Sequence, residues 1–183
     1  MLYILRHGKT DWNNAKRIQG KTNIPLNEEG RQQAREAAAE YKDVHLDVCY
    51  CSPLIRAKET AELLLAGRDV PIVFDKRLEE MGFGIYEGVA ESFSIPDCPV
   101  NELFWHPENY TVPVEKGDSL DELFARTGAF LEEKVKPDLA AGKDVLIVAH
   151  GATNSCIVTQ IKNRTRAEFW AEGIPNCKMQ RLL

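Results

Sequence analysis

The sequence predicts an α/β protein, a three-layer sandwich with a mostly parallel central sheet and helices on both faces. Short apolar runs with strand character alternate along the chain with segments of helical period. This alternation is typical of parallel strands joined by crossover helices. Two of the apolar runs also end in the same dipeptide, His-Gly, which suggests related positions in one sheet.

Four apolar runs are predicted to be strands, and they cover residues 2–5, 46–51, 70–74 and 145–149. Each is rich in Val, Ile, Leu, Tyr or Cys, as buried strands are. Five segments are predicted to be helices: 28–42, 53–66, 119–135, 152–162 and 166–172.

Local signals support three helix starts. Ser52 and Pro53 are expected to cap and begin the second helix. The pairs Ser119 with Glu122 and Thr165 with Glu168 have the spacing of a capping box.

Residues 89–113 interrupt this rhythm. They contain four prolines and four aromatic residues without clear periodicity. We expect an ordered insertion or lid, and the alternative is a surface connection that covers an edge of the core. With 183 residues the chain has the length of one domain, so residues 1–183 are predicted to form a single unit that includes this insertion.

Composition excludes several classes. The net charge of −5 gives no general basic field, so we expect neither nucleic-acid nor membrane partners. Five cysteines without a CxxC pair are typical of free thiols in a reducing compartment. No segment has the length of a membrane span, and the opening residues do not resemble a signal peptide, so we predict a cytoplasmic protein. The sequence does not indicate an oligomeric state.

The charges are unevenly distributed. Residues 1–21 contain five Lys or Arg and one Asp, whereas residues 75–122 contain twelve acidic residues and three basic ones. A local positive charge in an acidic protein favours a small anionic ligand.

Two strand ends carry the strongest functional signal. His7-Gly8 follows the first predicted strand, and His150-Gly151 follows the last. Ligands of open parallel sheets bind beyond the carboxyl ends of the strands, so neighbouring strands would bring both imidazoles into one crevice. Glycine suits a sharp turn or a close approach there. The helix predicted after Gly151 would offer free N–H groups to an anion.

Arg56 supplies a second signal. It lies in the first turn of a predicted helix, where a cation is unfavourable unless an anion is also bound. Arg6 directly precedes His7. Together the two arginines suit a bidentate clamp on a phosphoryl group.

These motifs resemble the histidine phosphatase superfamily, the phosphoglycerate mutase-like enzymes, nearly from end to end. The matching segments are Leu5–Thr10 (LRHGKT), Trp12-Asn13, Arg17–Gly20 (RIQG), Ser52–Ala57 (SPLIRA), Leu78–Gly88 (LEEMGFGIYEG), Val148–Gly151 (VAHG) and Asn176 before a final strand. The chain departs from the family pattern at Lys9, where Glu or Gln is usual, and at Ala152, where Gly is common. Neither change removes an expected catalytic group.

The resemblance implies specific roles. His7 is expected to be the nucleophile that forms a phosphohistidine, with Arg6, Arg56 and His150 stabilising the phosphoryl oxygens. Glu80 falls at the position of the general acid, and Glu79 and Glu87 are weaker candidates.

Further residues are expected to contact the phosphoryl group or substrate through the same resemblance: Asn13, Gln19, Gly20 and Gly151. No cofactor and no metal are implied. A metal site built from histidines and cysteines is the competing interpretation, although HExxH and paired CxxC spacings are absent.

Three functions remain open. A metal-independent phosphatase acting on small organic phosphomonoesters is favoured over a phosphoglycerate mutase-type phosphotransferase, because residues 89–113 contain no Lys or Arg that would hold a doubly charged substrate. A phospholigand-binding protein without turnover is the third. The aromatic residues of the insertion suggest an alcohol with apolar or ring surface.

Overall fold

The computed structural model describes residues 1–183, and its centre is a five-stranded sheet of order β3-β2-β4-β1-β5. The strands are β1 (Leu2–Arg6), β2 (Val48–Cys51), β3 (Ile72–Phe74), β4 (Val145–Ala149) and β5 (Met179–Arg181). The first four are mutually parallel, and only β5 runs antiparallel, to β1. The predicted α/β class with a mostly parallel sheet is confirmed.

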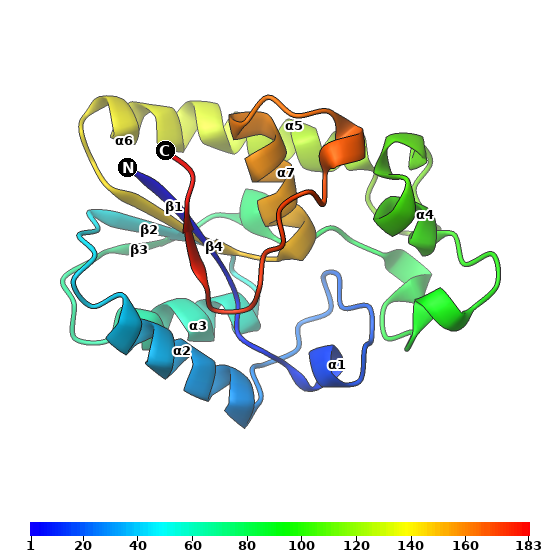
Figure 1. Ribbon diagram of the computed structural model, residues 1–183, viewed down its shortest axis with the longest axis horizontal. Helices are drawn as coiled ribbons and strands as arrows, with labels where there is room; N and C mark the ends of the chain where they lie inside the picture. Colours follow the sequence, from blue (N-terminus) through cyan, green and yellow to red (C-terminus); the bar gives the residue numbers. More distant parts are fainter.

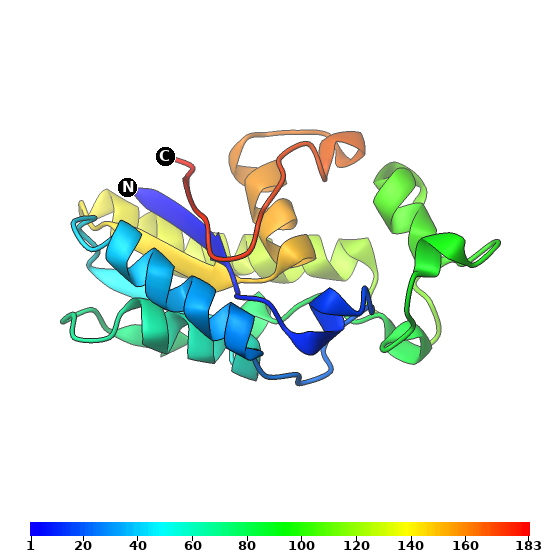
Figure 2. The ribbon, with the colours of Figure 1, turned by 60° about the horizontal axis from the view of Figure 1, so that its bottom comes forward.

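Two layers of helices enclose this sheet (Figures 1 and 2). The helices α2 (Glu28–Glu40) and α3 (Ile55–Leu64) cover one face. The other face is covered by α5 (Leu120–Phe130), α6 (Lys136–Ala140) and α7 (Gly151–Ile161). Two smaller helices, α1 (Asp11–Asn14) and α4 (Val100–Trp105), lie beyond one end of the sheet.

Alternation along the strands explains the layering. Leu2 and Ile4 of β1 belong to the apolar cluster that also contains Phe130, whereas Leu5 belongs to the cluster under α2 and α3. Successive side chains of a strand point to opposite faces, so each strand supplies both cores. This is why the strands read as continuous apolar runs in the sequence.

Several boundaries differ from those predicted. The helical run that starts at Leu120 continues to Ala140, past Pro137, through a wider π-helical turn at Leu131–Val135. Proline at the start of a new helical segment needs no N–H donor, so the run is not broken there. The prediction of a helix over 166–172 was wrong, because only a 3-10 turn at Arg166–Glu168 forms. The short helix α1 was not predicted from the residues.

The segment 89–113 is ordered and packs against the main body. Cys98, Val100, Leu103 and Tyr110 are buried in one apolar cluster with residues of α5 and α7. Figure 2 shows α4 beyond the end of the sheet, on the same side as α1. None of the helices combines the length and the apolar character that crossing a bilayer requires.

Two glycines let the loop after β1 lie directly on the start of α2. A Cβ on Gly8 would lie 2.5 Å from the carbonyl oxygen of Gly30, and a Cβ on Gly30 would lie 2.0 Å from that of Lys9. The close approach expected at Gly8 is therefore to another backbone segment. Gly151 differs, because a Cβ there would meet only ordinary contacts of 3.7 Å or more.

We predict that Gly30→Ala lowers the free energy of unfolding by about 1–3 kcal/mol, because the added methyl group overlaps a backbone oxygen that cannot move independently. Gly173→Ala is the matched control, since nothing lies within 4 Å of a Cβ there. Urea unfolding of both variants measures the difference. Equal stability of the two variants would contradict this account of the Gly8–Gly30 contact.

Candidate active site

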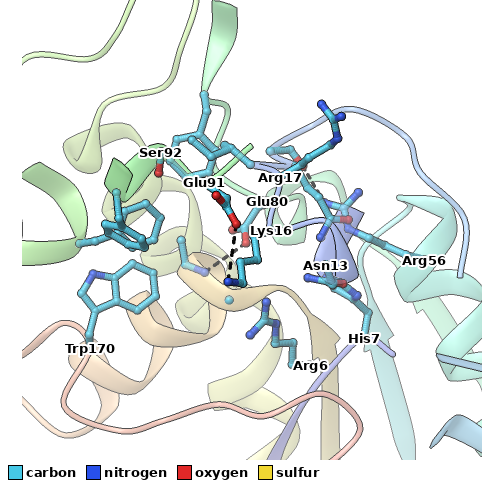
Figure 3. Close-up of a pocket in the computed structure, with 18 of the residues that line it drawn as sticks. Arg6, His7, Asn13, Lys16, Arg17, Arg56, Glu80, Glu91, Ser92 and Trp170 are labelled. Carbon is cyan, nitrogen blue, oxygen red and sulfur yellow. Dashed lines mark hydrogen bonds and ion pairs between the residues drawn. The ribbon is translucent and has the colours of Figure 1, made fainter. Parts of the chain in front are cut away.

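A pocket of about 450 Å³ lies beyond the carboxyl ends of the parallel strands (Figure 3). Its lining includes His7 directly after β1, Gly151 at the start of α7 after β4, and Arg56 in the first turn of α3 after β2. The parallel pairing of Arg6 with Ala149 places His7 and His150 on adjacent strand ends. The sequence-predicted residues that line it are Arg6, His7, Asn13, Gln19, Gly20, Arg56, Glu80 and Gly151.

His7 is buried, with 2% of its surface exposed, and one of its ring nitrogens is already engaged. Nδ1 lies 2.7 Å from the carbonyl oxygen of Gly8. A carbonyl only accepts, so this contact assigns the proton to Nδ1 and leaves a lone pair on Nε2. The main-chain carbonyl of His7 accepts from Asn176 Nδ2 at 2.6 Å, which anchors the residue from β5's side.

Burial lowers the pKa of His7 well below its usual value, and the nearby cations Arg56 and Arg6 lower it further. The imidazole is thereby kept neutral, the form in which Nε2 is nucleophilic.

The two arginines hold buried donors without protein partners. Arg56 is fully buried and donates to the carbonyl oxygens of Thr22 and Gly20, at 2.9 and 2.6 Å, while its Nε has no partner. Arg6 donates to the carbonyl of Ile174, and its Nε is also buried and unpartnered. Burial lowers the pKa of Arg56 to about 10, which still leaves it charged at neutral pH. Such donors suit an anion.

His150 lies behind this pocket and does not line it. It is fully buried, and its ring centroid is 5.1 Å from that of His7. Its Nε2 lies 2.7 Å from Ser52 Oγ, and its Nδ1 has no partner. Burial lowers its pKa well below the usual value, and of the nearby charged groups Arg56 lowers it most.

Ser52 has a different role from the predicted helix cap. The helix α3 begins at Ile55 with no side-chain cap, although Ser52 Oγ accepts weakly from Leu54 N at 3.3 Å. Its hydroxyl keeps one proton and a second lone pair, so it can either donate to His150 Nε2 or accept from it.

Glu80 takes the place at the start of α7 that the sequence suggested for an anion. Its Oε2 accepts from Ala152 N at 3.1 Å, and its Oε1 accepts from the backbone N–H and hydroxyl of Thr153, both at 3.1 Å. The carboxylate therefore lies at the positive end of the helix. Figure 3 shows it on the opposite side of the pocket from Arg56 and His7.

The two weaker acid candidates do not line the pocket. Both oxygens of Glu87 are used by backbone donors: Oε1 accepts from Lys21 N and Phe83 N, and Oε2 from Thr22 N. Gly20 has a positive φ of 57°, and a Cβ there would overlap Glu87. Glu87 and Gly20 thus shape the loop that holds Arg56.

Asn13 and Gln19 are oriented by Thr10. Asn13 Oδ1 accepts from the backbone and hydroxyl of Thr10, at 3.0 and 3.1 Å, in the capping box of α1. Gln19 Oε1 lies 2.9 Å from the same hydroxyl, whose single proton is shared between the two amide oxygens. Lys9 is not among the lining residues, because it pairs with Glu29 at 2.6 Å.

The pocket also has lining residues that the sequence did not individually assign to the site. They are Lys16, Arg17, Ile18, Phe83, Glu91, Ser92, Phe93, Ser94, Phe104, Ala152 and Trp170. Five of them come from 91–104, so the insertion forms part of the wall. Trp170 is the member that lacked a sequence signal, because it lies in a segment predicted as an ordinary helix.

The competing metal interpretation gains no support at this pocket. The one group of three metal-ligating side chains within reach of one another is His45, Asp47 and Asp144, next to the N-terminus of the chain. Cys49, Cys51 and Cys156 are buried and belong to no such group.

Comparisons with known proteins agree with this geometry. The profile of the histidine phosphatase superfamily (branch 1) matches residues 2–183. The chain belongs to this superfamily. A protein named probable phosphoglycerate mutase GpmB, from Escherichia coli, is 34% identical over 188 residues, which cover 99% of this chain and 83% of that protein.

Solved structures of the histidine phosphatase superfamily show the same fold. YhfR of Bacillus stearothermophilus superposes with a TM-score of 0.85 at 31% identity, over 97% of this chain and 88% of that one. The mycobacterial glucosyl-3-phosphoglycerate phosphatase Rv2419c, solved with VO3, gives 0.84 at 30% identity, over 97% and 90%. The predicted superfamily and its phosphoglycerate mutase-like architecture are confirmed.

The lowered pKa of His7 makes a prediction about stability. Below pH about 6.5 the unfolded chain binds a proton on this histidine that the folded chain does not. The free energy of unfolding therefore decreases as the pH is lowered. His7→Gln removes this contribution. As the pH is lowered, the free energy of unfolding of the variant should therefore decrease by about 1.4 kcal/mol less per pH unit than that of the wild type.

Urea unfolding between pH 7 and 5 measures these slopes. His106→Gln is the control, because the His106 side chain is largely exposed and lies away from the pocket. Parallel slopes for wild type and His7→Gln would show that His7 charges in the folded protein.

Proposed function

We propose that the protein is a metal-independent phosphatase that hydrolyses small organic phosphomonoesters through a phosphohistidine on His7. The observation that carries the proposal is the state of His7: a buried, neutral imidazole whose Nδ1 is engaged and whose Nε2 lone pair is free. The Nε atoms of Arg6 and Arg56, buried and without protein partners, belong to residues that line the same pocket. Membership of the superfamily supports the same chemistry.

In the first step the lone pair of His7 Nε2 forms a bond to phosphorus, and the bond from phosphorus to the alcohol oxygen breaks. Glu80, in its acid form, gives its proton to the departing oxygen. The product is a phosphohistidine, in which the ring keeps its Nδ1 proton and its positive charge lies next to the negative phosphoryl oxygens. One difficult substitution is thereby split into two.

In the second step water attacks the phosphorus of the phosphohistidine. The Glu80 carboxylate takes a proton from that water, and the N–P bond breaks to return neutral His7 and inorganic phosphate. The acid form of Glu80 is restored for the next cycle, so protons balance.

Fixed positive charge stabilises both transition states. The Nε atoms of Arg6 and Arg56 are buried and unpartnered in residues that line the pocket, and we assign them hydrogen bonds to the equatorial oxygens. His150, which the family resemblance implies as a third contact, is buried beside His7 and does not line the pocket. Removing one donor of this kind typically costs about 2.7–4 kcal/mol of barrier. Asn13 and Gln19, at the pocket wall, add neutral polar contacts, and Gly151 leaves the backbone accessible beside Arg6.

Phosphoglycerate mutase-type transfer is the second candidate, and the name of the Escherichia coli relative favours it. It requires the phosphohistidine to pass its phosphoryl group to a second hydroxyl of an anionic substrate. The pocket has two cations near its mouth, Lys16 and Arg17, and the first of these pairs with Glu91 at 3.7 Å. Residues 89–113 add none, so we favour hydrolysis.

A phospholigand-binding protein without turnover is the remaining alternative. It would bind phosphate at the same donors but would never carry a covalent phosphoryl group. Acid-labile phosphate on His7 after mixing with substrate distinguishes the two, and so does the release of inorganic phosphate.

We predict that the protein releases phosphate from a panel of phosphomonoesters in the presence of EDTA, and that His7→Ala lowers the rate by about a thousand-fold or more. His45→Ala is the control, because His45 is exposed and lies at the other end of β2. No release by the folded wild type would contradict hydrolysis. Full activity in His7→Ala would show that another group accepts the phosphoryl.

We predict that Glu80→Gln slows hydrolysis of glycerol phosphate by about 10²–10⁴-fold, because its alcohol leaves only when protonated. Formation of the phosphohistidine from p-nitrophenyl phosphate, whose phenolate leaves unaided, should change much less. Rapid-quench measurement of the p-nitrophenolate burst separates the two steps. Glu79→Gln, at the neighbouring carboxylate outside the pocket, should behave as wild type. If Glu80→Gln slowed phosphohistidine formation from both esters by the same factor, Glu80 would not be the acid that protonates the leaving alcohol.

A further inference from the structure

The wall of the pocket away from the phosphoryl-binding residues is aromatic. Phe83, Phe93, Phe104 and Trp170 all line it. They come from separate parts of the chain: the loop after Glu80, the insertion, and the segment after α7. Figure 3 shows Trp170 on the opposite side of the pocket from His7 and Arg56.

Three of these rings are nearly parallel. The centroids of Phe104 and Trp170 are 5.5 Å apart with an interplanar angle of 21°, and those of Phe83 and Phe104 are 6.4 Å apart at 23°. Phe93 meets Phe104 edge-on, at 5.4 Å and 69°. Parallel faces of this kind suit stacking of a further flat ring.

The Trp170 ring is held in place before any ligand binds. Its indole N–H donates to the carbonyl oxygen of Leu103 in α4, at 2.8 Å. Besides its stacking on Phe104, the ring meets the buried Phe169 edge-to-face at 4.7 Å. The one polar atom of the side chain is thus satisfied by α4, and the ring offers the pocket an apolar, rigid surface. Binding against such a surface costs little ordering entropy.

The charged groups at this end already have partners. Lys16 Nζ lies 3.7 Å from Glu91, and Arg17 donates to the carbonyl oxygen of Gly88 at 2.6 Å. An anionic group on the alcohol would have to compete with these contacts, and it would meet the Glu91 carboxylate. An uncharged ring has no such cost.

We propose that the preferred substrates are phosphomonoesters of alcohols that carry a flat, uncharged aromatic or heteroaromatic ring, which stacks against Trp170 and Phe104. The inference rests on the proposed phosphatase activity, since it assigns the alcohol side of the same pocket. Trp170 and Phe104 are then residues that determine specificity, and they act on binding of the alcohol and not on transfer of the phosphoryl group.

The test compares benzyl phosphate with cyclohexylmethyl phosphate. The two alcohols have the same carbon count and similar acidity, so they differ mainly in whether the ring is flat and aromatic. Stacking should favour benzyl phosphate by roughly 2- to 12-fold in kcat/KM. The preference should lie in KM, because the ring contact is the same before and during the reaction. Glycerol phosphate serves as the polar reference and should be a poorer substrate than either.

Two variants and a matched control locate the effect. In Trp170→Leu and in Phe104→Leu the ratio of benzyl to cyclohexylmethyl phosphate should fall towards one. In Trp105→Leu it should keep its wild-type value, because Trp105 lies next to Phe104 but is exposed and does not line the pocket. Thermal melting of each variant confirms that it is folded, and the second variant keeps the test decisive if one is not.

Binding without turnover separates this inference from the proposed function. Calorimetry with benzylphosphonate and methylphosphonate, which are not hydrolysed, should show tighter binding of the benzyl compound to wild type and a smaller difference in Trp170→Leu. A ratio near one in wild type, or a ratio unchanged in both pocket variants, would overturn the inference while leaving the phosphatase intact. Absence of turnover on every ester, with the phosphonate preference present, would instead overturn the phosphatase.

Discussion

Parallel pairing between β1 and β4 is the contact on which the candidate site depends. The register sets Arg6 opposite Ala149, so the residues that follow, His7 and His150, leave the sheet side by side. Their rings lie 5.1 Å apart although 142 positions separate them in the chain. Every other element of the site is arranged about this pair: α3 brings Arg56, and the loop before the insertion brings Glu80 to the start of α7.

Burial of charge without compensation explains the electrostatics of this arrangement. Two arginines are packed beside two histidines, which stay neutral because burial and the arginines both disfavour a further positive charge. Glu80 and Glu91 are the acidic residues that line the pocket, and the N-terminal end of α7 holds Glu80. The buried, unpartnered Nε donors of Arg6 and Arg56 suit an anion as counter-charge.

The segment 89–113 contributes both to the core and to the wall of the pocket. Its buried face, with Val100 and Leu103, continues the core of α5 and α7, and its other residues reach the pocket. The two interpretations of 89–113, a covering of the core edge and a wall of the site, therefore describe two faces of one segment. Because Leu103 also accepts the Trp170 N–H, the packing of the insertion and the shape of the alcohol side of the pocket are linked.

The sequence by itself determined the α/β class, four of the five strands and the candidate residues that lie beyond their ends. These depend on local signals: continuous apolar runs, and motifs in which His7 and His150 follow two strands while Arg56 lies in the first turn of the helix after a third. Tertiary structure alone decided what depends on contacts between distant segments. Ser52 bonds to His150 instead of capping a helix, Glu80 and not an external anion occupies the start of α7, and Trp170 joins the pocket. No periodicity or spacing encodes such contacts, because they arise only when separate elements pack together.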